Sequence, residues 1–215
     1  MKKFEEDIQS LLDNTSDMAD LVADMMERAV ISLIDGNVDV ATTVIDDFAK
    51  ADRYDRMIEE EALRVLSIYQ PTASDMRSSA TVLKSITYLE RIAKYSKNIA
   101  VATEYLSDKP SYPVIDCIAP MGEVAVRMVR LVTNGLHERS TEGFDKISEM
   151  DDYLDRNLRS GLNNIIGYIT ANPDSADVCT YYISVLKYIE RIGDHACKIA
   201  EKVTFMVTGE HTVIE

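Results

Sequence analysis

The sequence predicts an all-α protein made of two tandem three-helix bundles, with six long antiparallel helices. The first supporting observation is that only 8 Gly and 5 Pro occur in 215 residues, of which 46% are hydrophobic. Few helix breakers in a chain of this size favour long helices around a large core. The second observation is an apolar spacing of three and four residues, and the third is an internal repeat.

Five short stretches rich in turn-forming residues interrupt the chain, at 33–39, 69–75, 106–116, 136–143 and 170–177. Clusters of Gly, Pro, Asn and Asp of this kind end helices and form turns. Between them the sequence predicts six helices, at 4–35, 39–69, 74–106, 115–138, 141–171 and 176–208. Three of the predicted starts carry residues suited to cap a helix, namely Asp39, Ser74 and Thr141.

The last predicted helix carries the clearest apolar stripe. Its members alternate steps of four and three residues, and they are Val185, Ile189, Ile192, Ala196, Ile199, Val203 and Met206. A repeat near 3.5 residues is what helices crossing at shallow angles need, because one row of side chains then fills the grooves of its partner. The stripe therefore predicts a seam inside a helix bundle.

The two halves of the chain repeat each other at an offset of 100 residues. The segment "YLERIAKYSKNIA" (88–100) shares six identities with "YIERIGDHACKIA" (188–200), and "DRYDR" (52–56) lies over "DYLDR" (152–156). A repeat of this length indicates two copies of one structural unit. The predicted units are residues 1–107 and 115–215, joined near 107–114.

The second half carries two acidic pairs at helical spacing, Asp151 with Asp155 and Glu190 with Asp194. Like charges four residues apart on a helix repel each other. The two helices are expected to be neighbours, with both pairs at a similar distance from their connection. Four gathered carboxylates favour a metal cation, which takes oxygen ligands. We expect a surface site, with Asp151 nearest an apolar stripe; ordinary solvated acids are the alternative.

The first half keeps only part of this pattern. Its aligned residues are Ala51, Asp55, Glu90 and Lys94, so two of the four acids are missing. Lys94 follows Glu90 by four residues, where its ammonium group can supply positive charge. We expect a degenerate or empty site here, with Asp52, Asp55 and Glu90 as weaker metal candidates.

Other polar residues give weaker signals. His195 follows Asp194 and could join a metal site, although a structural hydrogen bond is the commoner role of a single histidine on a helix. Arg77, Arg91 and Arg191 are candidates for partner contacts, with structural ion pairs as the favoured alternative.

Charge and cysteine content exclude several classes of protein. The net charge of −14 argues against nucleic acid or anionic lipid as a partner, because such binding depends on Lys and Arg. The three cysteines form no CxxC pair, which argues against a disulfide framework or a thiolate metal site. No apolar run is long enough to cross a membrane, and we expect a cytoplasmic protein.

These residues resemble the PhoU family of phosphate-transport regulators over nearly the whole chain. The segment "IERIGDHACKIAE" (189–201) matches the family's "LERIGD" signature, and "LERIAKYSKNIA" (89–100) keeps its first four residues. The segment "PTASDMR" (71–77) matches a second family motif through Asp75 and Arg77, which marks both as possible partner contacts. The resemblance implies a PhoU-like fold of two tandem three-helix bundles.

The resemblance also implies a metal site and a regulatory function. Family members bind multinuclear metal clusters, often iron, through paired acidic motifs; zinc or other divalent ions are alternatives. Carried over to this chain, the implied ligands are Asp151, Asp155, Glu190 and Asp194. The implied function is regulation rather than catalysis, as an adaptor that restrains the phosphate ABC transporter and phosphate-responsive signalling.

The implied partners are the ATPase subunit of that transporter and a membrane histidine kinase, with a second copy of the chain as a further candidate. The protein would associate with the membrane peripherally, through the transporter. One alternative is an accessory regulator of a different inorganic-phosphate permease. A ferritin-like di-iron oxidase is a weaker alternative, because its sites use Glu-x-x-His motifs and none of the 3 histidines follows a Glu at that spacing.

Overall fold

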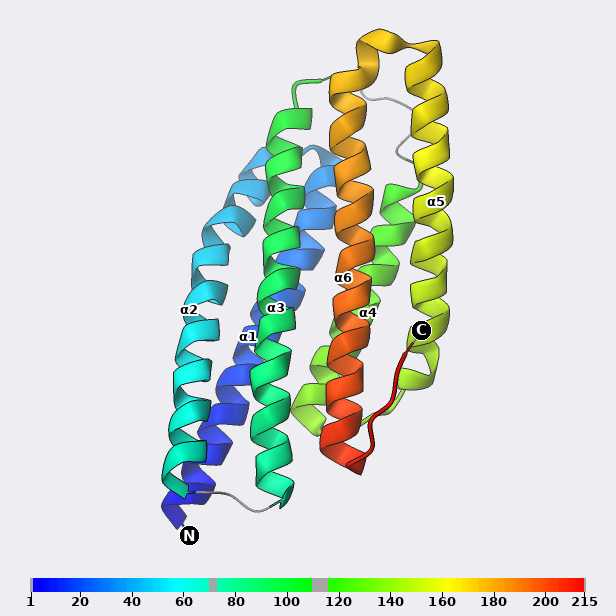
Figure 1. Cartoon of the computed structure of the whole chain (residues 1–215). Helices are drawn as coiled ribbons and strands as arrows, with labels where there is room; N and C mark the ends of the chain where they lie inside the picture. The colour runs from blue at the N-terminus through cyan, green and yellow to red at the C-terminus, as the bar shows by residue number, and fades with distance from the viewer. Residues whose placement is uncertain (1, 70–72, 110–115, 215) are drawn as a thin grey trace.

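The computed structural model describes residues 2–69, 73–109 and 116–214. These residues form six long helices and no strand, which confirms the all-α prediction (Figure 1). The long helices are α1 (Lys2–Asp35), α2 (Val38–Tyr69), α3 (Ala73–Leu106), α4 (Ile118–Glu138), α5 (Ile147–Ala171) and α6 (Ala176–Thr208). Two short 3-10 helices, η2 (Phe144–Lys146) and η3 (Pro173–Ser175), precede α5 and α6.

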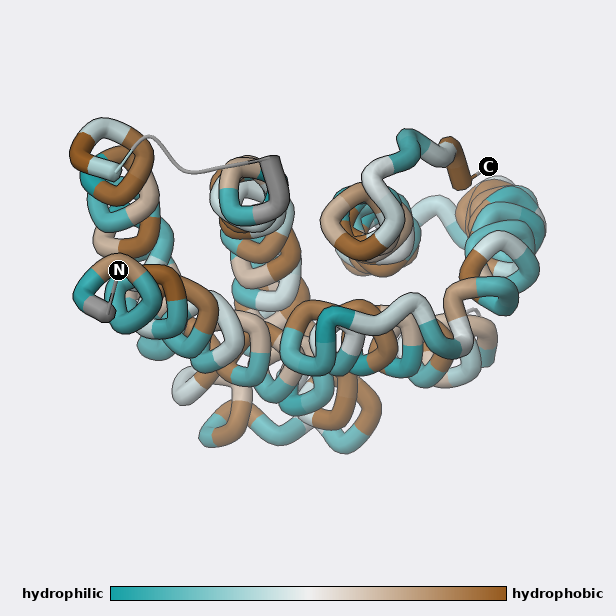
Figure 2. Tube along the Cα trace, turned by 90° about the horizontal axis from the view of Figure 1, so that it is seen from below, coloured by the Kyte–Doolittle hydropathy of each residue, from teal (hydrophilic) through white to brown (hydrophobic). Residues whose placement is uncertain are grey.

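The helices lie in two layers, and consecutive helices run antiparallel. The front layer of Figure 1 contains α2, α3, α6 and α5 in that order, while α1 and α4 lie behind it; Figure 2 shows both layers end-on. Each half of the chain supplies three helices, but α3 packs along α6 and α1 packs along α4. The buried side chains of both halves consequently form one continuous apolar core.

Several predicted helix starts need correction. Helix α2 begins at Val38, so Asp39 lies in its first turn, and the side chain of Asn37 instead accepts a hydrogen bond from the Val40 amide at 3.1 Å. Thr141 is not a helix cap either, because α5 begins only at Ile147, after η2 and a turn. Sequence patterns mislead here because Gly143, with φ of 80°, turns the chain before the helix can start.

The remaining boundaries agree with the predictions to within three residues. Helix α4 begins at Ile118 rather than at 115, and α6 spans the predicted 176–208. Residues 110–115, which include most of the predicted linker, lie outside the described residues, as does the side chain of Ser74. All seven residues of the predicted apolar stripe of α6, from Val185 to Met206, are buried.

None of the helices in the described ranges has an apolar stretch of the length needed to cross a lipid bilayer. Their apolar side chains pack in the protein core instead. The side chains of Met25, Met26, Met121 and Met128 are fully buried in this core. Flexible methionine side chains fill irregular space of this kind well.

Gly122 lies against Val30 where α4 packs on α1 at the back of the molecule. A Cβ atom on Gly122 of α4 would lie 2.5 Å from Cγ1 and 3.0 Å from Cγ2 of Val30 on α1. Valine is β-branched and holds one strongly preferred rotamer in a helix, so it cannot rotate away. The α1–α4 contact therefore depends on the absence of a side chain at this position.

We expect Gly122→Ala to lower the free energy of unfolding by about 1 kcal/mol or more. The reason is that overpacking typically costs roughly 1–3 kcal/mol, more than the up to 1 kcal/mol that alanine gains over glycine in a helix. Urea denaturation followed by circular dichroism measures the change. Gly167→Ala is the matched control, because no atom lies within 4 Å of its added Cβ, and it should be neutral or stabilising. Equal stabilisation by both variants would contradict the packing argument.

Candidate functional site

Helices α5 and α6 bring the two predicted acidic pairs to one surface. Asp151 and Asp155 come from α5, and Glu190 and Asp194 come from the antiparallel α6. Gly193 allows this approach, because a Cβ atom there would lie 2.5 Å from Leu154 Cδ1 and 3.5 Å from an Asp151 carboxylate oxygen. The glycine before Asp194 thus lets the Asp151 side chain lie against α6.

The four acids, which we call the carboxylate quartet, differ in exposure. The Glu190 side chain is 15% exposed and that of Asp194 35%, whereas that of Asp155 is 44% exposed. Asp151 is half-buried beside the core residues of α5, as the sequence predicted. Two carboxylates of the quartet are therefore substantially desolvated.

Burial and mutual repulsion disfavour the charged forms of these groups. Burial raises the pKa of Asp151 above the usual aspartate value, and the charges of Asp194 and Asp155 raise it further. Burial likewise raises the pKa of Glu190, with Asp194 as the strongest neighbouring charge. The thiol of Cys197 donates a hydrogen bond to Asp151, which opposes this shift. The charged forms of Asp151 and Glu190 are therefore less stable in the folded protein than in water.

Arg191 supplies the nearest counter-charge. Its guanidinium Nη1 lies 2.9 Å from Asp194, and its Nε lies 3.5 Å from Glu190. Asp155 has its own partner, the guanidinium of Arg159, at 3.5 Å. With these pairs formed, no three His, Cys, Asp or Glu side chains of the described residues converge tightly enough to hold a metal ion.

The quartet nonetheless has the chemistry of a cation site. It offers carboxylate oxygens from two helices, and hard or borderline metal ions prefer such donors. The raised pKa values of Asp151 and Glu190 indicate that an added positive charge there would be stabilised. Arg191, whose side chain is 58% exposed, pairs with Glu190 and Asp194, so a metal ion bound there would compete with its guanidinium group.

The first half presents a weaker version of the same arrangement. Ala51 is fully buried and offers no ligand, and Asp52 is paired with Arg56 on its own helix. Burial raises the pKa of both Asp55 and Glu90, while the positive charge of Lys94 lowers that of Glu90. The structure therefore brings the three weaker candidates to one face of α2 and α3, where Ala51 and Lys94 stand in place of two of the four acids of the second half.

His195 lies between the two halves rather than within the quartet. Its ring is stacked between Tyr88 and Tyr95 of α3, with centroid distances of 5.7 and 5.8 Å. The Nε2 atom is buried without a hydrogen-bond partner among the described residues. Burial, reinforced by the charges of Arg91 and Arg191, lowers the pKa of His195 to about 4.

A surface cavity of about 370 Å³ connects His195 with the quartet. Asp151, Asp194 and Cys197 line one side of it, and the chain after α6 returns so that Ile214 also lines it. The Ile214 amide donates a hydrogen bond to Glu201 at 3.2 Å. Sequence reasoning missed Cys197, although its position three residues after Asp194 places both on one face of α6.

The residues predicted to contact a partner do not form one cluster. Asp75 and Arg77 lie at the start of α3, where the Arg77 guanidinium approaches Gly209 at the end of α6. Arg91 and Arg191 lie further along the same helix pair, and both influence His195. The structure therefore joins Arg91 with Arg191 and leaves Asp75 and Arg77 at one end of the α3–α6 contact.

The chain matches the family model described as the PhoU domain twice, over residues 15–103 and 118–203. Among curated relatives, the phosphate-specific transport system accessory protein PhoU homolog of Rhizobium meliloti (strain 1021) is 30% identical, over 97% of this chain and 89% of the relative. The protein of the same description from Zymomonas mobilis is 29% identical, over 98% of this chain and 89% of the relative.

Solved structures show the same architecture. The crystal structure of PhoU from Pseudomonas aeruginosa superimposes with a TM-score of 0.92 at 27% identity, covering 96% of this chain and 100% of that chain. A phosphate transport system regulatory protein PhoU from Streptococcus pneumoniae superimposes with a TM-score of 0.87 at 21% identity, covering 97% and 99%. The second comparison supports the fold alone.

We expect Glu190→Gln to stabilise the protein near neutral pH in the presence of a chelator. The pKa of Glu190 is raised in the folded state, so wild-type stability falls as pH rises through that pKa, and glutamine removes this loss. The gain should shrink as pH falls below about 4, because the glutamate is then increasingly protonated in both states. Urea denaturation at several pH values tests this, with Glu123→Gln on α4 as the control for charge. A destabilisation independent of pH would contradict it.

Proposed function

Because the chain belongs to the PhoU family, we propose that it regulates phosphate uptake as a metal-binding adaptor. In this function it restrains the phosphate ABC transporter, phosphate-responsive signalling, or both. The supporting observation is that the PhoU match extends through both halves, and that curated relatives of nearly equal length are phosphate-specific transport system accessory proteins. The adaptor acts without a catalytic reaction of its own.

The carboxylate quartet is the proposed metal site. Asp151, Asp155, Glu190 and Asp194 would hold a transition metal, iron in the first place and zinc or another divalent ion otherwise. The bound ion would supply positive charge between α5 and α6. Half-buried acids with raised pKa values support this assignment, as does their origin from two facing helices.

The proposed partner is the ATPase subunit of the phosphate transporter, with a membrane histidine kinase as a second partner. Long helices that share one core form a stiff body with broad exposed faces, which suits docking to other proteins. Contact with the transporter would place the protein at the cytoplasmic side of the membrane. The net charge of −14 supports a protein partner rather than a direct contact with anionic lipid.

We expect purified protein to retain transition metal, and Glu190→Gln combined with Asp194→Asn to release most of it. Both substitutions remove ligand charge and leave side-chain size nearly unchanged. Elemental analysis measures the metal content, and circular dichroism checks the fold. Asp55→Asn with Glu90→Gln is the matched control in the first half and should retain the metal. Unchanged metal in the first double variant would exclude the proposed ligands.

We expect the tagged protein to retain the phosphate transporter's ATPase subunit more strongly from cells grown with abundant phosphate than from starved cells. The reason is that restraint of uptake is needed when phosphate is plentiful. Quantitative affinity capture with antibody detection of the subunit measures this difference. Retention of a separate inorganic-phosphate permease, without the ATPase subunit, would instead support a regulator of that permease.

A further inference from the structure

The contact line between α3 and α6 runs down the middle of the front layer (Figures 1 and 2). A column of stacked rings crosses it. Tyr188 lies 5.6 Å from Tyr95, Tyr95 lies 5.8 Å from His195, and His195 lies 5.7 Å from Tyr88. The three tyrosines are half-buried, so each shows part of its ring at the surface. The two halves of the chain contribute two rings each.

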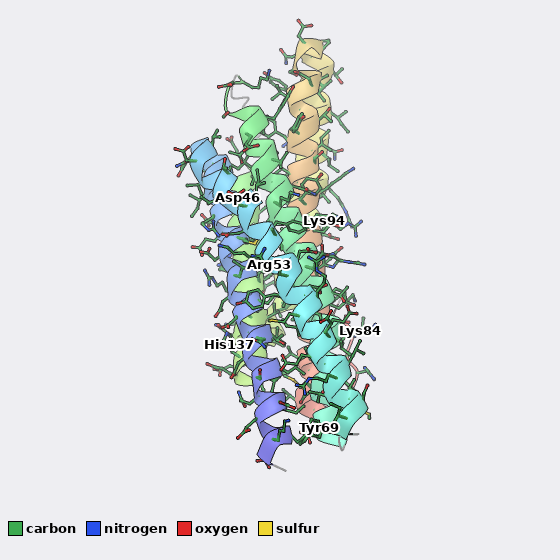
Figure 3. The ribbon with its side chains drawn as sticks, turned by 90° about the vertical axis from the view of Figure 1, so that its left-hand side faces the viewer. Asp46, Arg53, Tyr69, Lys84, Lys94 and His137 are labelled. Atoms are coloured by element: carbon green, nitrogen blue, oxygen red, sulfur yellow. The ribbon has the colours of Figure 1, made fainter. Side chains whose placement is uncertain are left out.

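Basic side chains surround this column. Arg91 of α3 and Arg191 of α6 both act on His195, and Lys198 lines the same cavity as Tyr88 and Arg91. Lys84 lies two helical turns before Arg91 on α3, and Figure 3 labels it at the right-hand edge of the molecule. We call these residues the α3–α6 seam; its members are Lys84, Tyr88, Arg91, Tyr95, Tyr188, Arg191, His195 and Lys198.

The positive charges of the seam are only partly neutralised. Arg191 pairs with Asp194, and Lys198 pairs with Glu201 at 2.7 Å, in both cases on their own helix. Neither Lys84 nor Arg91 forms an ion pair within the parts of the chain that the structure describes, and both are exposed. On a protein with a net charge of −14, Lys84 and Arg91 are therefore exposed positive charges that no described ion pair neutralises.

Several hydrogen-bonding groups of the seam also lack a partner among the described residues. The hydroxyl groups of Tyr88, Tyr95 and Tyr188 make no hydrogen bond to any described residue, and neither does the buried Nε2 of His195. Tyrosine and arginine are the side chains most enriched at the energetic centres of protein interfaces. Arg91 and the three partly exposed tyrosines are therefore available to contact a partner protein.

Acidic groups border the seam on both sides. On the α2 side stand Asp52, Asp55 and Glu90, and on the α5 side stands the carboxylate quartet. A broad polyanion, such as a lipid bilayer or a nucleic acid, would meet these acids as well as the basic strip. Because charges are felt over about 8 Å at physiological salt, only a narrow anionic ligand gains from the seam without this repulsion.

We propose that the α3–α6 seam binds an acidic helical or extended segment of a partner protein, with carboxylates placed against Arg91 and Lys84 and the tyrosine rings beneath. Charge complementarity of this kind steers association and fixes the register of the segment. The inference rests on the proposed adaptor function for the identity of the partner. The chemistry of recognition can be tested separately.

The test uses a fluorescein-labelled peptide of alternating Ala and Glu residues, and the same peptide with Gln in place of Glu. Fluorescence anisotropy with the full chain at low salt should show binding of the Glu peptide at least about tenfold tighter than of the Gln peptide. Lys84→Glu with Arg91→Glu should weaken it by about tenfold or more. Equal binding of the two peptides would overturn the proposal.

The matched control is Arg53→Glu with Arg127→Glu, which makes the same change in net charge on exposed residues of α2 and α4. This variant should change peptide binding by less than about twofold at moderate salt. If the control variant lost as much affinity for the Glu peptide as the seam variant, general charge repulsion would explain both losses. That result would contradict a local binding site. Phosphatidylcholine vesicles with phosphatidylserine should not compete; effective competition would identify a lipid surface instead.

The metal variant separates this inference from the proposed function. Glu190→Gln with Asp194→Asn leaves Lys84 and Arg91 in place, so it should still bind the Glu peptide. Peptide binding without capture of the transporter ATPase would contradict the proposed function and support the seam. Capture of the ATPase by the Lys84→Glu, Arg91→Glu variant at wild-type strength would support the function and exclude the seam as its docking surface.

Discussion

The structure depends on one packing constraint, which is that α6 buries side chains against three helices at once. Helix α6 contacts α3, α4 and α5, so only a narrow strip of it reaches solvent. On one edge of this strip Glu190 and Asp194 face α5, and on the other Tyr188 and His195 face α3. The candidate metal site and the seam therefore lie on two sides of one helix.

Arg191 connects these two surfaces electrostatically. It pairs with Glu190 and Asp194, and its charge also lowers the pKa of His195. A cation at the carboxylate quartet would compete with Arg191 for the same two acids. Both surfaces interact with the same guanidinium group. A change in charge at the carboxylate quartet would therefore change the electrostatic environment of His195.

Sequence patterns predicted some features of the site well and others poorly. The acidic pairs were visible because residues four apart on a helix share a face, and the depth of Asp151 followed from the apolar stripe of α5. The Asp39 and Thr141 caps were wrong, since short polar residues stand close together at both turns and any of them could cap. The ring column around His195 was not predicted, because its rings come from residues about 100 positions apart.

The sequence by itself determined the six helices, the internal repeat and the two acidic pairs, because helical periodicity and turn residues act over a few neighbouring positions. Only the tertiary structure decided that α3 packs on α6, that both halves share one core, and that Arg191 pairs with two of the acids. The physical reason is that the choice of partner helix and the rotation about each helix axis follow from side-chain packing between distant residues. Gly122 against Val30 and Gly193 against Leu154 are contacts of this kind.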